Sequence, residues 1–95
     1  MSGGHFDYNQ WKLQMIADEI EQLIIDNDSD EKNDWGDTKG YHFNEDTIRQ
    51  FKAAVALLRV SYTFVQRIDW LVSGDDGEDS FHRRLKDELE KLKNV

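Results

Sequence analysis

The sequence predicts an all-α protein, a three-helix bundle around one long central helix that is completed by oligomerisation. The central helix is indicated by Ile48–Val72, where apolar residues occupy well over half of the circumference at about 100° per residue. Segments on both sides repeat apolar residues at helical spacing, and the 95-residue chain contains no proline. Because so short a chain leaves much of its surface exposed, we expect subunit contacts to complete the burial. We predict one domain over residues 1–95, with helices near 7–25, 45–72 and 80–94 and a long acidic loop over 26–43.

Composition narrows the classes of partner and of site. The chain has 20 Asp and Glu residues against 12 Lys and Arg, for a net charge of −8, which argues against direct binding to a nucleic-acid backbone. Cysteine is absent, so disulfides and thiolate metal sites are excluded. No apolar run is long enough to span a membrane, and Met1–Gln10 lacks the pattern of a signal peptide, so we expect a cytoplasmic protein and no membrane partner.

The first predicted helix has a start signal and two apolar strips. Asp7 is expected to be its N-cap, with Gln10 completing a capping box. One strip is expected to pack against the central helix and consists of Leu13, Ile16, Ala17, Ile20, Leu23 and Ile24. The other lies on the far side and consists of Tyr8, Trp11 and Met15. We predict that this far strip is the interface of a homodimer or higher oligomer, the alternative being that the Gly3-Gly4 arm or the long loop covers it.

The loop over 26–43 fits a calcium-binding frame only in part. The position that needs glycine for a sharp turn is Glu31, and the last position is an aspartate instead of the usual glutamate. We therefore interpret the segment as a solvated acidic loop, keep a calcium-binding helix–loop–helix as an alternative, and predict no metal ligands. The alternating frame consists of Asp26, Asp28, Asp30, Lys32, Asp34 and Asp37.

The other helix boundaries have clear signals. Asn44 is expected to cap the central helix and Ser73-Gly74 to end it. Asp79 or Ser80 is expected to cap the third helix, whose narrow apolar stripe consists of Phe81, Leu85, Leu89 and Leu92.

Four polar residues suggest an enzymatic alternative. All-α nucleoside-triphosphate pyrophosphohydrolases bind Mg²⁺ with a Glu-x-x-Glu facing a Glu-x-x-Asp on another helix. Here the candidates are Asp18 with Glu21 and Gln66 with Asp69, so one carboxylate of the four is an amide. Asp69 also lies within the apolar arc, and we expect it to pair with His82, Arg83 or Arg84, or else to bind a ligand.

A basic arc on the central helix is the main candidate binding site. It carries no acid, although the chain is acidic, and its partners are either internal acids or an anionic ligand or protein surface. In the functional interpretation Arg59 and Arg67 hold the partner and Trp70 anchors it. The predicted binding residues are Arg49, Lys52, Arg59, Thr63, Arg67 and Trp70.

Two segments, Gly3–Tyr8 and Asp69–Leu85, resemble small uncharacterised proteins of bacteria and their phages. Small acidic phage-type proteins often act by binding, so the resemblance implies an inhibitor that blocks a host protein or sequesters a nucleotide ligand. We interpret the chain as a small acidic, non-enzymatic interaction protein without a cofactor or catalytic residues. Its expected partner is a protein or a small anionic ligand.

Overall fold

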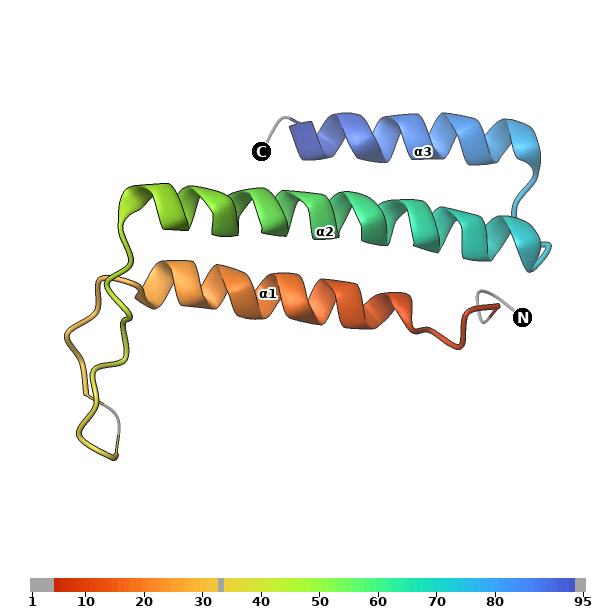
Figure 1. Ribbon diagram of the computed structural model, residues 1–95. Coiled ribbons are helices and arrows are strands. Elements are labelled where there is room, and N and C mark those ends of the chain that lie inside the picture. Colours follow the sequence, from red (N-terminus) through yellow and green to blue (C-terminus); the bar gives the residue numbers. More distant parts are fainter. Residues whose placement is uncertain (1–4, 33, 94–95) are drawn as a thin grey trace.

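The computed structural model describes residues 5–32 and 34–93 and shows an all-α protein, as the sequence predicts. Its helices are α1 (Gln10–Asp26), α2 (Glu45–Val72) and α3 (Glu78–Lys93). Figure 1 shows α2 in the middle, with α1 and α3 antiparallel to it on opposite sides. Within the described residues, α1 and α3 pack against α2 and make no contact with each other.

The helices form a single flat layer. The principal extents are 53 × 27 × 14 Å, so the smallest dimension is little more than one helix with its side chains. The radius of gyration is 17.3 Å, whereas a compact domain of this length has a value of about 12 Å. Both faces of α2 therefore stay partly open, because α1 and α3 cover only its sides (Figure 1).

The apolar interior of the layer is small. Among the described residues, Ala17 and Val55 are the only buried hydrophobic side chains. The predicted packing strip of α1 is only partly correct, because Ile16 is 47% exposed and Leu23 is 40% exposed. The α1 residues that contact α2 are largely polar, since Gln10, Gln14 and Glu21 all bond to α2 side chains. The helix is thus rotated, so that Ala17 of the strip is buried while Ile16 and Leu23 lie beside the contact with α2.

The start of α1 differs from the predicted capping box. Asp7 and Tyr8 have positive φ angles of 54° and 61°, which place them in a turn, and the helix begins at Gln10. The N–H groups of Asn9, Trp11 and Lys12 donate to backbone carbonyls of residues 6, 8 and 9. Because the turn satisfies these donors, Asp7 is not needed as an N-cap, and the Gln10 side chain is free to reach α2.

The boundaries of α2 and the start of α3 test the predicted capping signals, and the connection between these two helices is tight. Asn44 caps α2 as predicted by accepting a hydrogen bond from the Thr47 N–H, and Gly74, with φ of 84°, follows the last turn at Ser73. The predicted cap of α3 at Asp79 or Ser80 is wrong by two or three residues, since the helix begins at Glu78. The Ser80 hydroxyl instead accepts from the Gly77 N–H and donates to Asp76. The last residue of the predicted range 80–94 lies outside the described residues.

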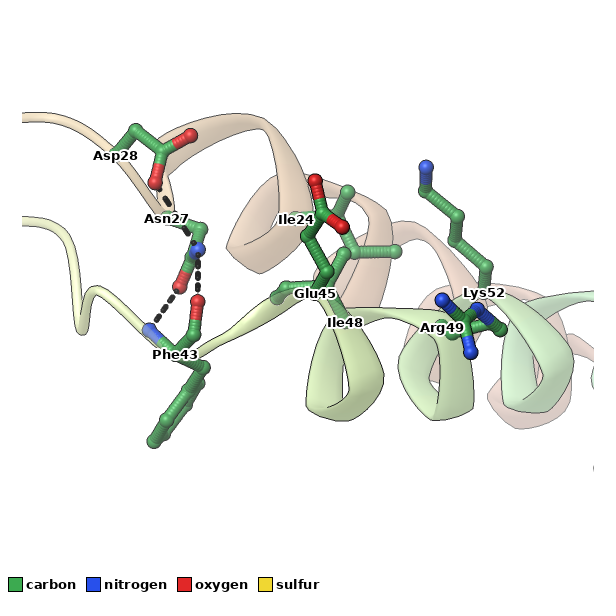
Figure 2. Close-up of a pocket in the computed structure, with 8 residues that line it drawn as sticks. All are labelled: Ile24, Asn27, Asp28, Phe43, Glu45, Ile48, Arg49 and Lys52. Carbon is green, nitrogen blue, oxygen red and sulfur yellow. Dashed lines mark hydrogen bonds between the residues drawn. The ribbon is translucent and has the colours of Figure 1, made fainter.

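The long loop is closed at its base by Asn27. Its side chain donates to the Phe43 carbonyl at 3.0 Å and accepts from the Phe43 N–H at 2.9 Å, as Figure 2 shows. Near the tip, Lys32 and Thr38 form an isolated antiparallel bridge. Gly40 lies in the narrow base, where an added Cβ would be 2.4 Å from the Asn27 carbonyl oxygen.

We predict that Gly40→Ala lowers the free energy of unfolding by at least about 1 kcal/mol, because the new methyl group meets backbone oxygens that cannot move aside. Thermal and urea denaturation followed by circular dichroism would measure the change. Gly77→Ala is the matched control, since a Cβ there has its nearest neighbour at 4.0 Å. Equal stability of the two variants would contradict the tight base.

Candidate functional site

A large hollow in the described part of the chain is a groove that runs over α2 between α1 and α3. Its volume is about 890 Å³. All three helices contribute to its lining, and most of the lining side chains are apolar. The groove stays open because α1 and α3 do not close over α2. The lining residues are Glu21, Ile24, Ile25, Lys52, Val55, Ala56, Arg59, Val60, Phe64, Leu89, Leu92 and Lys93. We call this hollow the apolar groove.

The charged residues at the apolar groove are mostly cationic. Arg59 bridges to α1, with Nη2 at 3.1 Å from Asp18 and 3.0 Å from Glu21. The hydrogen bond to Glu21 is the main reason that the pKa of Arg59 is raised, and burial opposes it. Lys52 and Lys93 make no ion pair within the described residues, so their charges face the open groove.

A smaller hollow adjoins the apolar groove at the loop end of the helices. It has a volume of about 390 Å³ and includes Asn27, Phe43, Ile48, Arg49 and Lys52 among its lining residues. Figure 2 shows Arg49 and Lys52 together on the α2 side, away from the hydrogen-bonded Asn27 and Phe43. Arg49 pairs with Asp46 at 3.0 Å. Lys52 lines both hollows and links them.

The predicted basic arc does not form one exposed surface. Arg67 is 2% exposed, with Nη1 at 4.0 Å from Asp76 and Nε at 3.8 Å from Glu88 of α3. Its guanidinium carbon lies 4.0 Å from the ring centroid of Trp70, a cation–π contact within the protein. The Thr63 hydroxyl donates to the Arg59 carbonyl. Thus Arg67 faces Glu88 of α3 and lies against Trp70 of its own helix, whereas Lys52 and Arg59 remain at the apolar groove.

Asp69 is the centre of a buried polar cluster at the other end of the molecule. It is 0% exposed and accepts hydrogen bonds from the His5 N–H at 2.7 Å, Gln10 Nε2 at 2.9 Å and the Ser73 hydroxyl at 3.4 Å. Gln10 Nε2 also donates to Gln66. The expected pairing with His82, Arg83 or Arg84 is therefore wrong, because the N-terminal segment and α1 supply the donors.

The two segments that carry the resemblance meet at this cluster. The backbone of His5 and the carboxylate of Asp69 are hydrogen-bonded although they are distant in the sequence. Gly3 and Gly4 of the first segment lie outside the described residues. The alternative in which this arm covers Tyr8, Trp11 and Met15 therefore falls outside them as well. Both segments therefore have the same structural role, because together they close one end of the layer.

The residues of the magnesium alternative do not face one another. Asp18 and Glu21 bind Arg59, whereas Gln66 and Asp69 bind Gln10, which precedes Asp18 by about 12 Å along α1. In the acidic loop, Lys39 approaches Asp26 and Glu31, and His42 approaches Asp30. Within the described residues, no three His, Asp or Glu side chains are grouped so that they could hold a metal ion.

The predicted oligomer strip lies at the surface. Tyr8, Trp11 and Met15 are 50%, 53% and 58% exposed, and Trp11 contacts Tyr62 of α2 at 5.9 Å between ring centroids. The pKa of the Tyr62 hydroxyl is raised mainly by burial, and the negative charge of Glu88 raises it further.

Sequence reasoning found Lys52 and Arg59 but missed the apolar part of the groove. Val60, Leu89 and Leu92 line it, and nothing in their local sequence separates them from ordinary helix packing residues. One signal was present, since the α3 stripe is narrow and covers only a small part of the α2 surface. A sequence this rich in apolar residues on α2 therefore had to leave some of them uncovered.

Comparisons with protein-family models, with curated proteins and with solved structures found no match to this chain. No helix in the described part of the chain is both long and apolar enough to cross a membrane.

We predict that Asp69→Ala lowers the free energy of unfolding by about 2–4 kcal/mol, because buried donors of His5 and Gln10 lose a charged acceptor. Urea denaturation would measure the loss. Asp87→Ala, at an exposed position of α3, is the control and should change the stability by less than about 0.5 kcal/mol. A small effect at Asp69 would show that the cluster contributes little.

A second prediction concerns how the stability of the turn between α2 and α3 depends on pH. The hydrogen bond from Ser80 is the main cause that lowers the pKa of Asp76 below 3.8, and Arg84 and Arg67 contribute. The folded state then binds fewer protons than the unfolded state, so this stability is present above pH 3.8 and is lost as the pH falls through the lowered value. Denaturation from pH 7 downward should show a steeper acid loss for the natural protein than for Asp76→Asn. Parallel curves would contradict this role.

Proposed function

We propose that this protein is a non-enzymatic binding protein whose apolar groove receives an amphipathic helix of a protein partner. The observation that carries the proposal is an apolar groove, in a chain of net charge −8, with two lysines that form no ion pair among the described residues. Contiguous apolar surface of this kind, rimmed by polar side chains, is typical of protein interaction sites.

The dimensions of the apolar groove fit a helix. Its α2 floor runs from Lys52 to Phe64, which corresponds to about 18 Å, or slightly more than three helical turns. The neighbours α1 and α3 form two walls, and a helix above α2 would contact all three at the usual 8–10 Å interaxial distance. A ligand helix with apolar residues at i, i+3, i+4 and i+7 would place them on Ala56 and Val60.

The charges indicate the kind of helix. Lys52 and Lys93 lie at the apolar groove without an ion pair in the described residues, so acidic residues beside the apolar stripe of the partner would find counter-charges there. Arg67 and Trp70, the expected anchors for a small anion, are engaged with Asp76, Glu88 and each other. This arrangement favours a protein partner over a nucleotide ligand.

The proposal agrees with the inhibitor function that the resemblance to phage-type proteins implies. A protein that takes up a helix of a host protein blocks whatever that helix normally contacts. We further propose that it acts in the cytoplasm and as a homo-oligomer, without a cofactor.

Filling the apolar groove provides the test. We predict that Ala56→Trp abolishes partner binding while the melting temperature stays the same or rises, because Ala56 is exposed on the groove floor and the indole would occupy the space. The natural protein and the variant would be used as parallel baits in a lysate of the source cell. A protein retained by the first and lost by the second supports the groove, whereas identical captured sets would contradict it.

A charge-matched pair of variants tests the cationic rim. Lys52→Glu with Lys93→Glu should weaken binding of the captured partner by roughly tenfold or more, since attraction becomes repulsion. Lys86→Glu with Lys91→Glu changes the net charge equally at exposed α3 positions outside the groove. Isothermal titration calorimetry would compare the two double variants. Equal weakening would indicate net charge alone and not the groove.

A further inference from the structure

A second apolar surface lies on the other face of the layer. On α2, apolar or small residues repeat at alternating spacings of three and four, and on α1 a shorter set repeats in the same way. We call this surface the apolar seam. On α2 it consists of Phe51, Ala54, Leu58, Ser61, Val65, Ile68 and Val72, and on α1 of Leu13, Ile16, Ile20 and Leu23.

The apolar seam is distinct from the apolar groove. At about 100° per residue, the seam positions of α2 are centred roughly 180° from Lys52, Ala56, Arg59 and Val60 of the groove. On α1, the seam is displaced from Gln10, Gln14 and Glu21, which contact α2, so it lies beside that contact. One face of the layer therefore carries the groove and the other carries the seam.

The apolar seam is partly uncovered in the single chain, since Phe51, Leu58 and Val65 are half-buried and other seam residues are exposed. Ile16 and Ile68 are 47% and 36% exposed, and Leu23 and Val72 are 40% and 52% exposed. None of the seam positions is charged, although 34% of the residues of the chain are. A sustained heptad repeat without charges is typical of a helix seam that packs against another helix.

We propose that the apolar seam is covered by the seam of a second copy of this chain, so that α1 and α2 of two protomers form a four-helix core. The surface area supports a partner of this size. The accessible surface is 7142 Å², whereas a compact monomer of this mass exposes about 5,700 Å². The excess of about 1,400 Å² belongs to both faces of the flat layer, and it is larger than the roughly 800 Å² that one partner contributes to a standard stable interface.

The order of residues along the apolar seam indicates why the occupant is a second copy. The α2 seam has its midpoint at Ser61, with Leu58 and Val65 on either side and large apolar residues toward both ends. A twofold axis near Ser61 would pack the two α2 seams against each other in antiparallel directions. Leu58 would then lie beside Val65 of the partner subunit, and the small Ser61 would lie where the helices approach most closely. In an interface about a twofold axis the same patch is used on both subunits, and a seam that is apolar on both sides of its midpoint meets this condition.

The dimer would carry its two apolar grooves on opposite outer faces. This consequence rests on the proposed function, because it makes the protein a bivalent binder. The dimer itself does not depend on what the groove binds.

The test uses two neighbouring residues of α1 that point to opposite faces. Ile16, in the apolar seam, is 47% exposed, and Met15, in the strip with Tyr8 and Trp11, is 58% exposed. Because both side chains are exposed in the single chain, glutamate at either position should leave the helical circular dichroism spectrum unchanged. Sedimentation equilibrium and light scattering of the full chain would measure the mass against the 11.2 kDa of one protomer.

The natural protein and Met15→Glu should both sediment at twice the chain mass. Ile16→Glu should raise the dimer dissociation constant by at least about 100-fold, because symmetry places the buried carboxylate in the interface twice. Ile68→Glu on α2 should do the same. A natural protein that is monomeric at high micromolar concentration would overturn the proposal, as would dissociation by Met15→Glu but not by Ile16→Glu. Partner capture by monomeric Ile16→Glu separates the two proposals, since an intact groove keeps binding when the dimer is lost.

Discussion

The buried carboxylate of Asp69 fixes how α1 lies on α2. It is the largest fully buried side chain of the described residues, and its donors come from the N-terminal segment, α1 and the end of α2. Hydrogen bonds to a charged group contribute roughly 1.5–3 kcal/mol each, which is comparable with full burial of a valine side chain. Because Ala17 and Val55 are the only buried hydrophobic residues in the described chain, this polar cluster is a substantial part of what orders the layer.

The polar contact determines what the rest of the layer leaves open. Gln10 and Gln14 reach Gln66 and Arg59 only when the polar side of α1 is turned toward α2. The apolar strip of α1 must then lie on one face, next to the apolar residues of α2 that neither neighbour covers. The same rotation places Glu21 and Ile25 on the opposite face, where they form one wall of the apolar groove. One set of hydrogen bonds thus gives the molecule two different open surfaces.

Helix positions could be predicted from the sequence because their signals are local. Asn44 caps α2, and Gly74 follows its end with the positive φ that glycine tolerates. The start of α1 could not be predicted in the same way, since the turn at Asp7 and Tyr8 comes directly after His5, whose hydrogen bond to Asp69 is a contact distant in the sequence. The rotation of α1 was missed for a related reason. An apolar strip predicts a buried helix face, but it does not say whether the same chain or another one buries it.

The candidate site shows the same limit. Arg59 and Arg67 lie on neighbouring parts of one polar arc, and both bind acids of other helices that helical periodicity cannot locate. Their pairing leaves Lys52 and Lys93 as the cations of the apolar groove.

Electrostatics acts differently on the two open surfaces. Two protomers of charge −8 repel each other, and an interface without charges, such as the apolar seam, adds no specific attraction that salt would screen. Salt therefore reduces only the repulsion between protomers and favours their association. At the apolar groove, the attraction between its cations and an acidic helix is itself screened, because the Debye length at physiological ionic strength is about 8 Å. Under the two proposals, the same rise in salt favours contact through the apolar seam and weakens the attraction between the cations of the apolar groove and an acidic helix.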